Sequence, residues 1–129
     1  YGLEAAQKLA VPTAQVFKTL VVSVDNQSLV VGIVPVSSML SMKLIAKAAG
    51  AKKAHMAEAL AVERSSGYVL GGVSPLGQKK RLMTVIDASA QQFDCIYVSA
   101  GKRGLEISLS PADLQCLLNA KFADICAQT

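Results

Sequence analysis

The sequence predicts a mixed α/β fold in which a curved, partly closed β-sheet is flanked by helices. Three observations lead to this prediction. A length of 129 residues suits a single domain covering residues 1–129. Two neighbouring segments rich in β-branched residues are joined by a short polar turn. The helical and extended patterns that follow do not alternate strictly, which argues against a uniformly parallel sheet.

The first elements are predicted to be a short helix and a β-hairpin. Apolar residues recur on one helical face of residues 2–10 (GLEAAQKLA). Residues 16–24 (VFKTLVVSV) and 28–36 (SLVVGIVPV) are dense in β-branched side chains, which favour strands. The polar residues 25–27 between them supply the turn.

The middle of the chain is predicted to contain two helices and a strand. Ser37 or Ser38 can cap a helix that runs to about Ala49, where a glycine follows. A second helix is expected over residues 56–64, and a short glycine-bounded strand over residues 67–73.

The last part of the chain is predicted to form three strands and a helix. Residues 82–86, 94–99 and 105–109 have the composition or the alternation of strands. The segment Ser-Pro-Ala-Asp at residues 110–113 combines a capping serine, a proline in the first turn and an acid, as helix starts do.

Composition excludes several classes of protein. The longest apolar run extends only from Leu29 to Val36, which is too short to span a membrane. The chain has one histidine, so a mechanism that needs two imidazoles is excluded. The three cysteines are odd in number and far apart, which favours small buried side chains and a reduced, cytoplasmic setting over a disulfide framework. The net charge of +4 is modest.

The most informative stretch is GGVSPLGQKKR, residues 71–81. Gly72 and Gly77 have the spacing of a phosphate loop, but Gln78 stands where lysine is required and Lys80 where serine or threonine binds magnesium. A nucleoside-triphosphate loop is therefore excluded. Two interpretations are left: a turn whose backbone approaches a ligand closely, or a tight turn followed by a solvated basic tail.

Other cations are placed unusually. Lys18 shares a face of its predicted strand with Val16 and Leu20, so its ammonium either meets an anion or extends to solvent at a sheet edge. A second glycine-bounded loop, residues 99–104 (SAGKRG), carries two more cations, and residues 52–53 add another pair. Such small clusters fit contact with a few phosphates better than binding to duplex DNA.

His55 and Glu58 could present two metal ligands on one helical turn. A metal site needs further convergent ligands, and the chain has no second histidine. We therefore predict a surface histidine and no metal, and we find no Ser-His-acid arrangement.

Three motifs occur in order along the chain: FKTL at residues 17–20, a segment at 67–77 that begins with Gly-Tyr and contains GGVSPLG, and YVSAGKRG at 97–104. Together they resemble the YbaK-type aminoacyl-tRNA deacylases, which are related to the editing domain of bacterial prolyl-tRNA synthetases. The resemblance covers essentially the whole chain. Members of that family begin with a further helix and strand before the position of Tyr1, so we expect these elements to be lacking here.

The resemblance implies an editing-domain fold with a small pocket and a trans-editing activity. The implied substrate is mischarged tRNA, most commonly Cys-tRNA(Pro), and the implied partner protein is prolyl-tRNA synthetase. The ester would be cleaved without any cofactor, either by hydrolysis or by attack of the substrate's own thiol.

The resemblance also assigns the site residues. Lys18 would act in catalysis together with the backbone N–H groups of Gly71 and Gly72. The substrate would be bound by Tyr1, Thr19, Ser38, Ser74, Ser99, Gly101 and Glu106, and the tRNA phosphates by Lys79, Lys80, Arg81, Lys102 and Arg103. A non-catalytic module that binds the tRNA end or a synthetase remains an alternative, as does a small-molecule-binding protein of the same fold.

Overall fold

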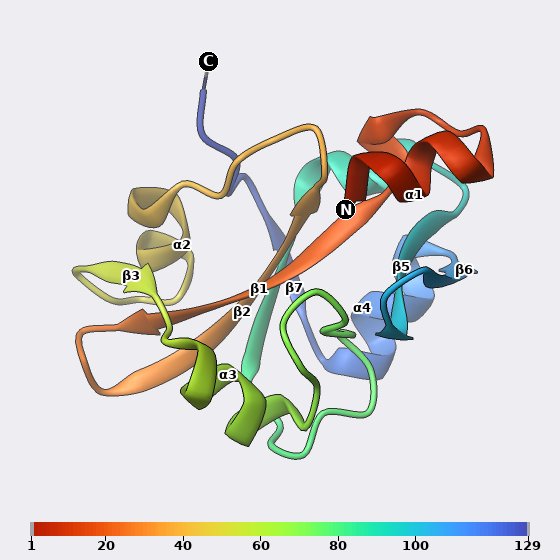
Figure 1. The fold of residues 1–129 in the computed structure, drawn as a ribbon. Coiled ribbons are helices and arrows are strands. Elements are labelled where there is room, and N and C mark those ends of the chain that lie inside the picture. Colours follow the sequence, from red (N-terminus) through yellow and green to blue (C-terminus); the bar gives the residue numbers. More distant parts are fainter. Residues whose placement is uncertain (1, 129) are drawn as a thin grey trace.

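The structure is a computed structural model that describes residues 2–128, and its main element is a five-stranded sheet (Figure 1). The helices are α1 (Gly2–Leu9), α2 (Met42–Ala48), α3 (Ala59–Ser66) and α4 (Pro111–Leu118), with short 3-10 turns at Thr13–Gln15 and Ala88–Gln92. The strands are β1 (Phe17–Val24), β2 (Ser28–Pro35), β3 (Ala54–Met56), β4 (Met83–Asp87), β5 (Ile96–Lys102), β6 (Leu105–Leu109) and β7 (Lys121–Ala123).

The sheet is mixed, in the order β3-β1-β2-β4-β7. Strand β1 is antiparallel to both of its neighbours, whereas β4 is parallel to β2 and to β7. Strands β5 and β6 form a separate antiparallel pair with a bulge between Ser99 and Lys102. The predicted mixed α/β fold is confirmed, and so is the hairpin, in which Phe17 lies opposite Pro35 and Val24 opposite Ser28.

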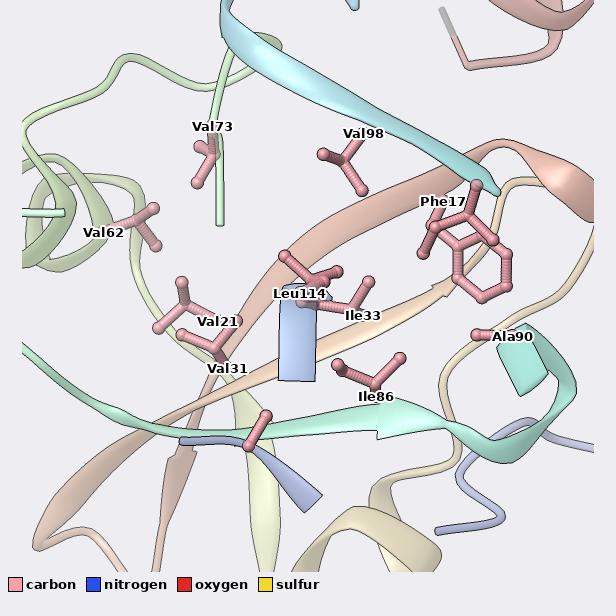
Figure 2. Packing of buried hydrophobic residues seen from close by; sticks show 12 residues of the cluster. Phe17, Val21, Val31, Ile33, Val62, Val73, Ile86, Ala90, Val98 and Leu114 are labelled. Carbon is pink, nitrogen blue, oxygen red and sulfur yellow. The ribbon is translucent and has the colours of Figure 1, made fainter. Parts of the chain in front are cut away.

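Both faces of the sheet are covered by other elements. The side chains of β1 alternate between the two faces and therefore enter two separate cores. Phe17 and Val21 point into a core shared with α3, α4 and β5, as Figure 2 shows. Val22 and Val24 point into a second core under α2. Helix α2 packs closely there, since a Cβ atom at Gly32 would lie only 2.8 Å from Ile45 Cδ1.

Two predicted helices begin at other residues than expected. Helix α2 starts at Met42, and its cap is Ser41, whose side chain accepts the Leu44 N–H at 3.1 Å. Neither Ser37 nor Ser38 caps it, because the chain there forms a turn. Helix α3 covers Ala59–Ser66 rather than residues 56–64, because Ala54–Met56 pair with β1 as strand β3.

The strand predicted over residues 67–73 is wrong. Gly67 ends α3 with a φ of 83°, and Gly71 has a φ of 91°, so the backbone does not stay extended. The Gly72 N–H donates to Val69 O at 3.0 Å, which closes a turn instead of a strand ladder. This segment is therefore a loop, called the glycine loop below (residues 67–77).

The cysteine prediction is also corrected. Cys116 is exposed on α4, and Cys95 and Cys126 are half-buried rather than fully buried. His55 is exposed, as expected, but it lies in β3 instead of at a helix start. Among residues 2–128, no helix combines the length and the apolar character that crossing a membrane requires.

Candidate functional site

A cleft of about 370 Å³ lies where α1, β1, the glycine loop and the β5–β6 pair meet. Five of the residues singled out from the sequence line it: Lys18, Thr19, Gly71, Ser99 and Glu106. Its other lining residues are mostly apolar: Gly2, Leu3, Val16, Phe17, Leu20, Val36, Leu70 and Val73. A cavity of a few hundred Å³ with a small number of polar groups is typical of a small-ligand site.

The cleft lies at a gap in the pairing of β1. On the edge of β1 away from β2, strand β3 pairs only with Val22–Val24, and a single bridge joins Val16 to Tyr97 of β5. Residues 17–20 lie between these two contacts. Because the cleft is at the edge of the strand, successive side chains from both faces of β1 reach it.

The glycine loop forms the opposite wall and is held in three places. Val73 is buried in the same core cluster as Val62 and Val98 (Figure 2). The Tyr68 hydroxyl donates to Leu76 O, and its ring packs so closely on Gly101 that a Cβ atom there would lie 2.7 Å from Tyr68 Cε1. The loop is therefore fixed against the bulge of β5.

The two adjacent glycines of the loop have different environments. Gly71 lines the cleft, has a φ of 91° and would have open space around an added Cβ. Its N–H donates to no acceptor among the described residues 2–128. Gly72 is buried: its N–H is bonded to Val69 O, and a Cβ there would lie 3.2 Å from Arg103 N. Of the pair, Gly71 is thus the residue whose N–H is available to a ligand.

Two polar side-chain atoms in the cleft are buried without a hydrogen-bond partner. They are Thr19 Oγ1 and Glu106 Oε2, and neither has a partner within residues 2–128. Burial raises the pKa of the Glu106 carboxyl group, because removing water disfavours its charged form. Unsatisfied buried polar atoms are costly, so their presence in a cleft points to a ligand that completes them.

Lys18 lines the cleft, and its charge also acts on the thiol of Cys126. Burial and then the Asp87 carboxylate raise the pKa of the Cys126 thiol to about 11, although Ser38 and Lys18 oppose the rise. The thiol is therefore protonated at neutral pH and is a poor nucleophile. Cys126 is also not among the residues that line the cleft.

Several predicted site residues lie outside the lining of the cleft. Ser38 is next to Cys126, and the buried Ser74 uses its hydroxyl to accept the Leu76 N–H at 3.2 Å. Gly72 packs against the backbone of the β5–β6 turn, and Gly101 packs against the Tyr68 ring. Tyr1 falls outside the described residues.

The predicted phosphate-binding cations divide into two groups. Lys102 and Arg103 are exposed at the β5–β6 turn, next to Gly72 and so beside the glycine loop. Lys80 and Arg81 line a separate hollow of about 200 Å³ at the end of α4. Lys79 is the remaining member of that group, and its side chain extends along Gly67. A Cβ atom added at Gly67 would lie 3.1 Å from Lys79 Cγ.

Sequence reasoning missed the apolar walls of the cleft. Leu3 and Leu70 line it although both are more than half exposed, and Leu20 and Val36 complete the wall. A Cβ at Gly2 would overlap the Val36 side chain, so α1 is packed directly onto the end of β2. The amphipathic pattern of α1 was visible in the sequence, but not the surface that it covers.

Comparison with known proteins adds the following findings. Residues 3–117 match the aminoacyl-tRNA editing domain. The chain is 41% identical over 120 residues to a protein of Enterococcus faecalis named as a candidate Cys-tRNA(Pro)/Cys-tRNA(Cys) deacylase, EbsC, covering 93% of this chain and 73% of that protein.

Two solved structures have the same fold. One is described as a candidate trans-editing enzyme for prolyl-tRNA synthetase, with a TM-score of 0.90, 22% identity, and coverage of 99% of this chain and 80% of the other. The other is from work on computational epitope grafting onto scaffold proteins, with a TM-score of 0.91, 23% identity, and coverage of 98% and 80%. At these identities the two structures support the fold alone.

The raised pKa of Glu106 predicts a stability cost that depends on pH. Below the unfolded-state value of 4.5 both states are protonated and the residue is neutral to stability. As the pH rises above 4.5 the unfolded chain loses this proton first, so the folded state becomes relatively less stable. We expect Glu106→Gln to be more stable than the wild type at pH 7, with the difference vanishing below pH 4.5, as measured by urea unfolding.

Glu4→Gln is the matched control, because Glu4 is exposed and lies on α1 near the same end of the molecule. It should not reproduce the pH-dependent gain in stability. An equal or lower stability of Glu106→Gln at pH 7 would contradict the interpretation of a carboxyl group buried without a partner.

Proposed function

This chain belongs to the aminoacyl-tRNA editing domain family, and on that basis we propose that it is a trans-editing deacylase that clears mischarged tRNA, principally Cys-tRNA(Pro). The observation that carries the proposal is the cleft, where Lys18, Gly71, Ser99 and Glu106 converge from three separate parts of the chain. The YbaK-type resemblance seen in the sequence is confirmed by the family match. We also propose that the protein acts in the cytoplasm and that prolyl-tRNA synthetase recruits it.

The cleft suits an ester that is already reactive. We assign the Gly71 N–H to the ester carbonyl oxygen, where it stabilises the negative charge that develops during attack. No described histidine or cysteine lines the cleft, and Cys126 holds its proton at neutral pH. The nucleophile is therefore assigned to the substrate or to water.

For a cysteinyl ester we propose attack by the substrate's own thiol. The sulfur forms a bond to the ester carbonyl carbon, the ester C–O bond breaks, and the thiol proton passes to the 3′ oxygen that leaves with the tRNA. Water then opens the resulting thiolactone to free cysteine. This route explains how a cleft with few catalytic groups could still select cysteine, because size alone separates substrates that differ by one methylene only about 10- to 200-fold.

The cations are assigned to the tRNA. Lys18 lines the cleft, and we assign it to the phosphate or ribose of the terminal nucleotide. Lys102 and Arg103 flank the glycine loop, so they would contact the neighbouring acceptor end. Lys80 and Arg81 line the separate hollow at the end of α4, and we assign them, with the preceding Lys79, to phosphates further along the tRNA.

Gly71→Ala tests the role of the glycine loop. Because φ is 91° at Gly71, an alanine is strained there and should move the N–H away from the carbonyl oxygen. Loss of one such donor costs about 10²- to 10³-fold in kcat, so we expect a fall of at least roughly tenfold in single-turnover deacylation of Cys-tRNA(Pro).

Gly50→Ala is the control, since Gly50 also has a positive φ of 73° and open space but lies at the end of α2. The two variants should lose similar stability, while only Gly71→Ala should lose activity. Equal rates for both variants would contradict the assignment of Gly71.

The attacking group is tested by comparing Cys-tRNA(Pro) with 2-aminobutyryl-tRNA(Pro). The two side chains have nearly the same size, but only cysteine has a thiol. We expect the wild type to release cysteine at least about tenfold faster, beyond any difference in the uncatalysed rates, because size selection alone is weak between such similar groups.

Release of 2-aminobutyrate at the rate of cysteine would show that water attacks and that the thiol is not needed. Salt-dependent binding of charged tRNA without release of any amino acid from Cys-, Ala- or Ser-tRNA would favour the non-catalytic module instead.

Charge reversal tests the tRNA contacts. The double variant Lys102→Glu, Arg103→Glu should bind tRNA more weakly and with a flatter dependence on salt, because each lost phosphate contact lowers the salt slope by nearly one. The control is Lys52→Glu, Lys53→Glu at the far end of β1, next to Asp25. If both double variants weaken binding equally, the cations act only through net charge.

A further inference from the structure

We propose that Glu106 and Thr19 form a binding site for the α-ammonium group of the aminoacyl ester, so that this protein acts only on substrates with a free amino group. The inference rests on the proposed deacylase function and adds a rule of selection that does not depend on the amino-acid side chain. Under this rule, N-blocked esters such as formylated aminoacyl-tRNA and peptidyl-tRNA are left intact.

Glu106 has the position and the chemistry to bind a cation. It lies on β6 directly opposite Ser99 of β5, and both residues line the cleft. Its Oε2 atom is buried and has no hydrogen-bond partner among residues 2–128. A buried carboxylate without a partner is expensive, and a bound ammonium supplies both the opposite charge and the donors that it lacks.

Two lysines near the cleft, Lys8 and Lys18, act on other acidic or polar groups. Lys8, at the end of α1, pairs with Glu4 at 3.4 Å. Lys18 lines the same cleft, but it lies on the other face of β1 from Thr19, and its charge acts on Cys126. Burial, and no neighbouring charge, is what shifts the Glu106 pKa. Among residues 2–128, no cation is bonded to Glu106 Oε2, so the ammonium group of a ligand can neutralise it.

Thr19 supplies further acceptors. Its Oγ1 atom is buried without a partner among the described residues, and Thr19 is one of the residues that line the cleft. The Val16 carbonyl accepts the Val36 N–H on the β2 side, whereas the Val21 carbonyl accepts the Ala57 N–H on the opposite edge. Backbone polar groups alternate between the two edges of a strand, so the Thr19 carbonyl points to the same edge as that of Val21, where no strand pairs with it.

These acceptors match what an ammonium group requires. A primary ammonium has three N–H donors and no acceptor. Glu106 Oε2, Thr19 Oγ1 and the Thr19 carbonyl offer three acceptors and one negative charge at the wall of a single cleft. Acylating the amine removes the charge and leaves at most one N–H donor. Such a group could not donate to both Glu106 Oε2 and Thr19 Oγ1, so one of these buried atoms would stay unpaired.

The experiment measures binding with ligands that cannot be cleaved. The probes are the amides of 3′-amino-3′-deoxyadenosine with alanine and with N-acetylalanine, and the readout is the ratio of their dissociation constants by calorimetry. The proteins are the wild type, Glu106→Gln, Thr19→Val and the control Glu58→Gln, which changes an exposed carboxyl group at the start of α3, outside the cleft. Urea unfolding of each variant confirms that it is folded.

We expect the wild type and Glu58→Gln to prefer the free amine by roughly 10- to 100-fold, the range of hydrogen bonds to charged groups. Glu106→Gln should bring the ratio close to one, and Thr19→Val should lower it partly. A wild-type ratio near one, an unchanged ratio in Glu106→Gln, or failure of the wild type to bind either amide would overturn the proposal.

The result is independent of turnover. If the wild type prefers the free amine but releases no amino acid from any charged tRNA, the ammonium site stands and the deacylase function is wrong. If it deacylates Cys-tRNA(Pro) but shows no preference between the amides, the function stands and the ammonium site is wrong.

Discussion

The unpaired edge of β1 is the constraint on which the site depends. A strand that is paired along both edges has no free backbone N–H or C=O groups there and no space for a ligand beside it. Here β3 covers one end of the edge and the Val16–Tyr97 bridge covers the other, so residues 17–20 are left open. Helix α1 and the glycine loop close this opening from two sides, which converts a sheet edge into a cleft and also protects it from pairing with another chain.

The same strand serves the core and the cleft because its side chains alternate. Phe17 and Val21 are almost fully buried and hold β1 against the helices and β5. Thr19 lies between them on the same face, and its hydroxyl is buried without a partner. The unpaired Thr19 Oγ1 and Glu106 Oε2 atoms each cost the folded protein stability. A ligand that pairs with Thr19 and Glu106 would recover that cost as binding free energy.

The sequence predicted the central parts of the fold better than the connections. The hairpin was clear because both strands are rich in β-branched residues, and the start of α4 was clear because Ser110 and Pro111 are strong local signals. The segment at 67–73 was misread as a strand, since its β-branched and aromatic residues favour extension, while the two glycines with positive φ override that preference. Strand β7 was missed because its three residues gain their structure from pairing with β4, which no local pattern reports.

The candidate site could be predicted only in part, because local motifs identify the segments that form it but not how they pack together. The motifs identified Lys18, Gly71, Ser99 and Glu106, which do line one cleft. They could not distinguish residues that face the ligand from those that support them, because both kinds are held in the same loops.

Gly71 and Gly72 show why this distinction matters chemically. The turn bond from the Gly72 N–H to Val69 O and the close approach of Gly72 to the β5–β6 turn fix the backbone at that point. With Gly72 fixed and Tyr68 packed on Gly101, the backbone next to Gly71 is held in place, so in the proposed reaction the Gly71 N–H would act as a donor without rearrangement. A rigid donor of this kind stabilises charge on any ester carbonyl and cannot by itself distinguish one aminoacyl group from another. Selection then has to come from groups that contact the rest of the substrate, and in this cleft the polar ones are Lys18, Thr19, Ser99 and Glu106.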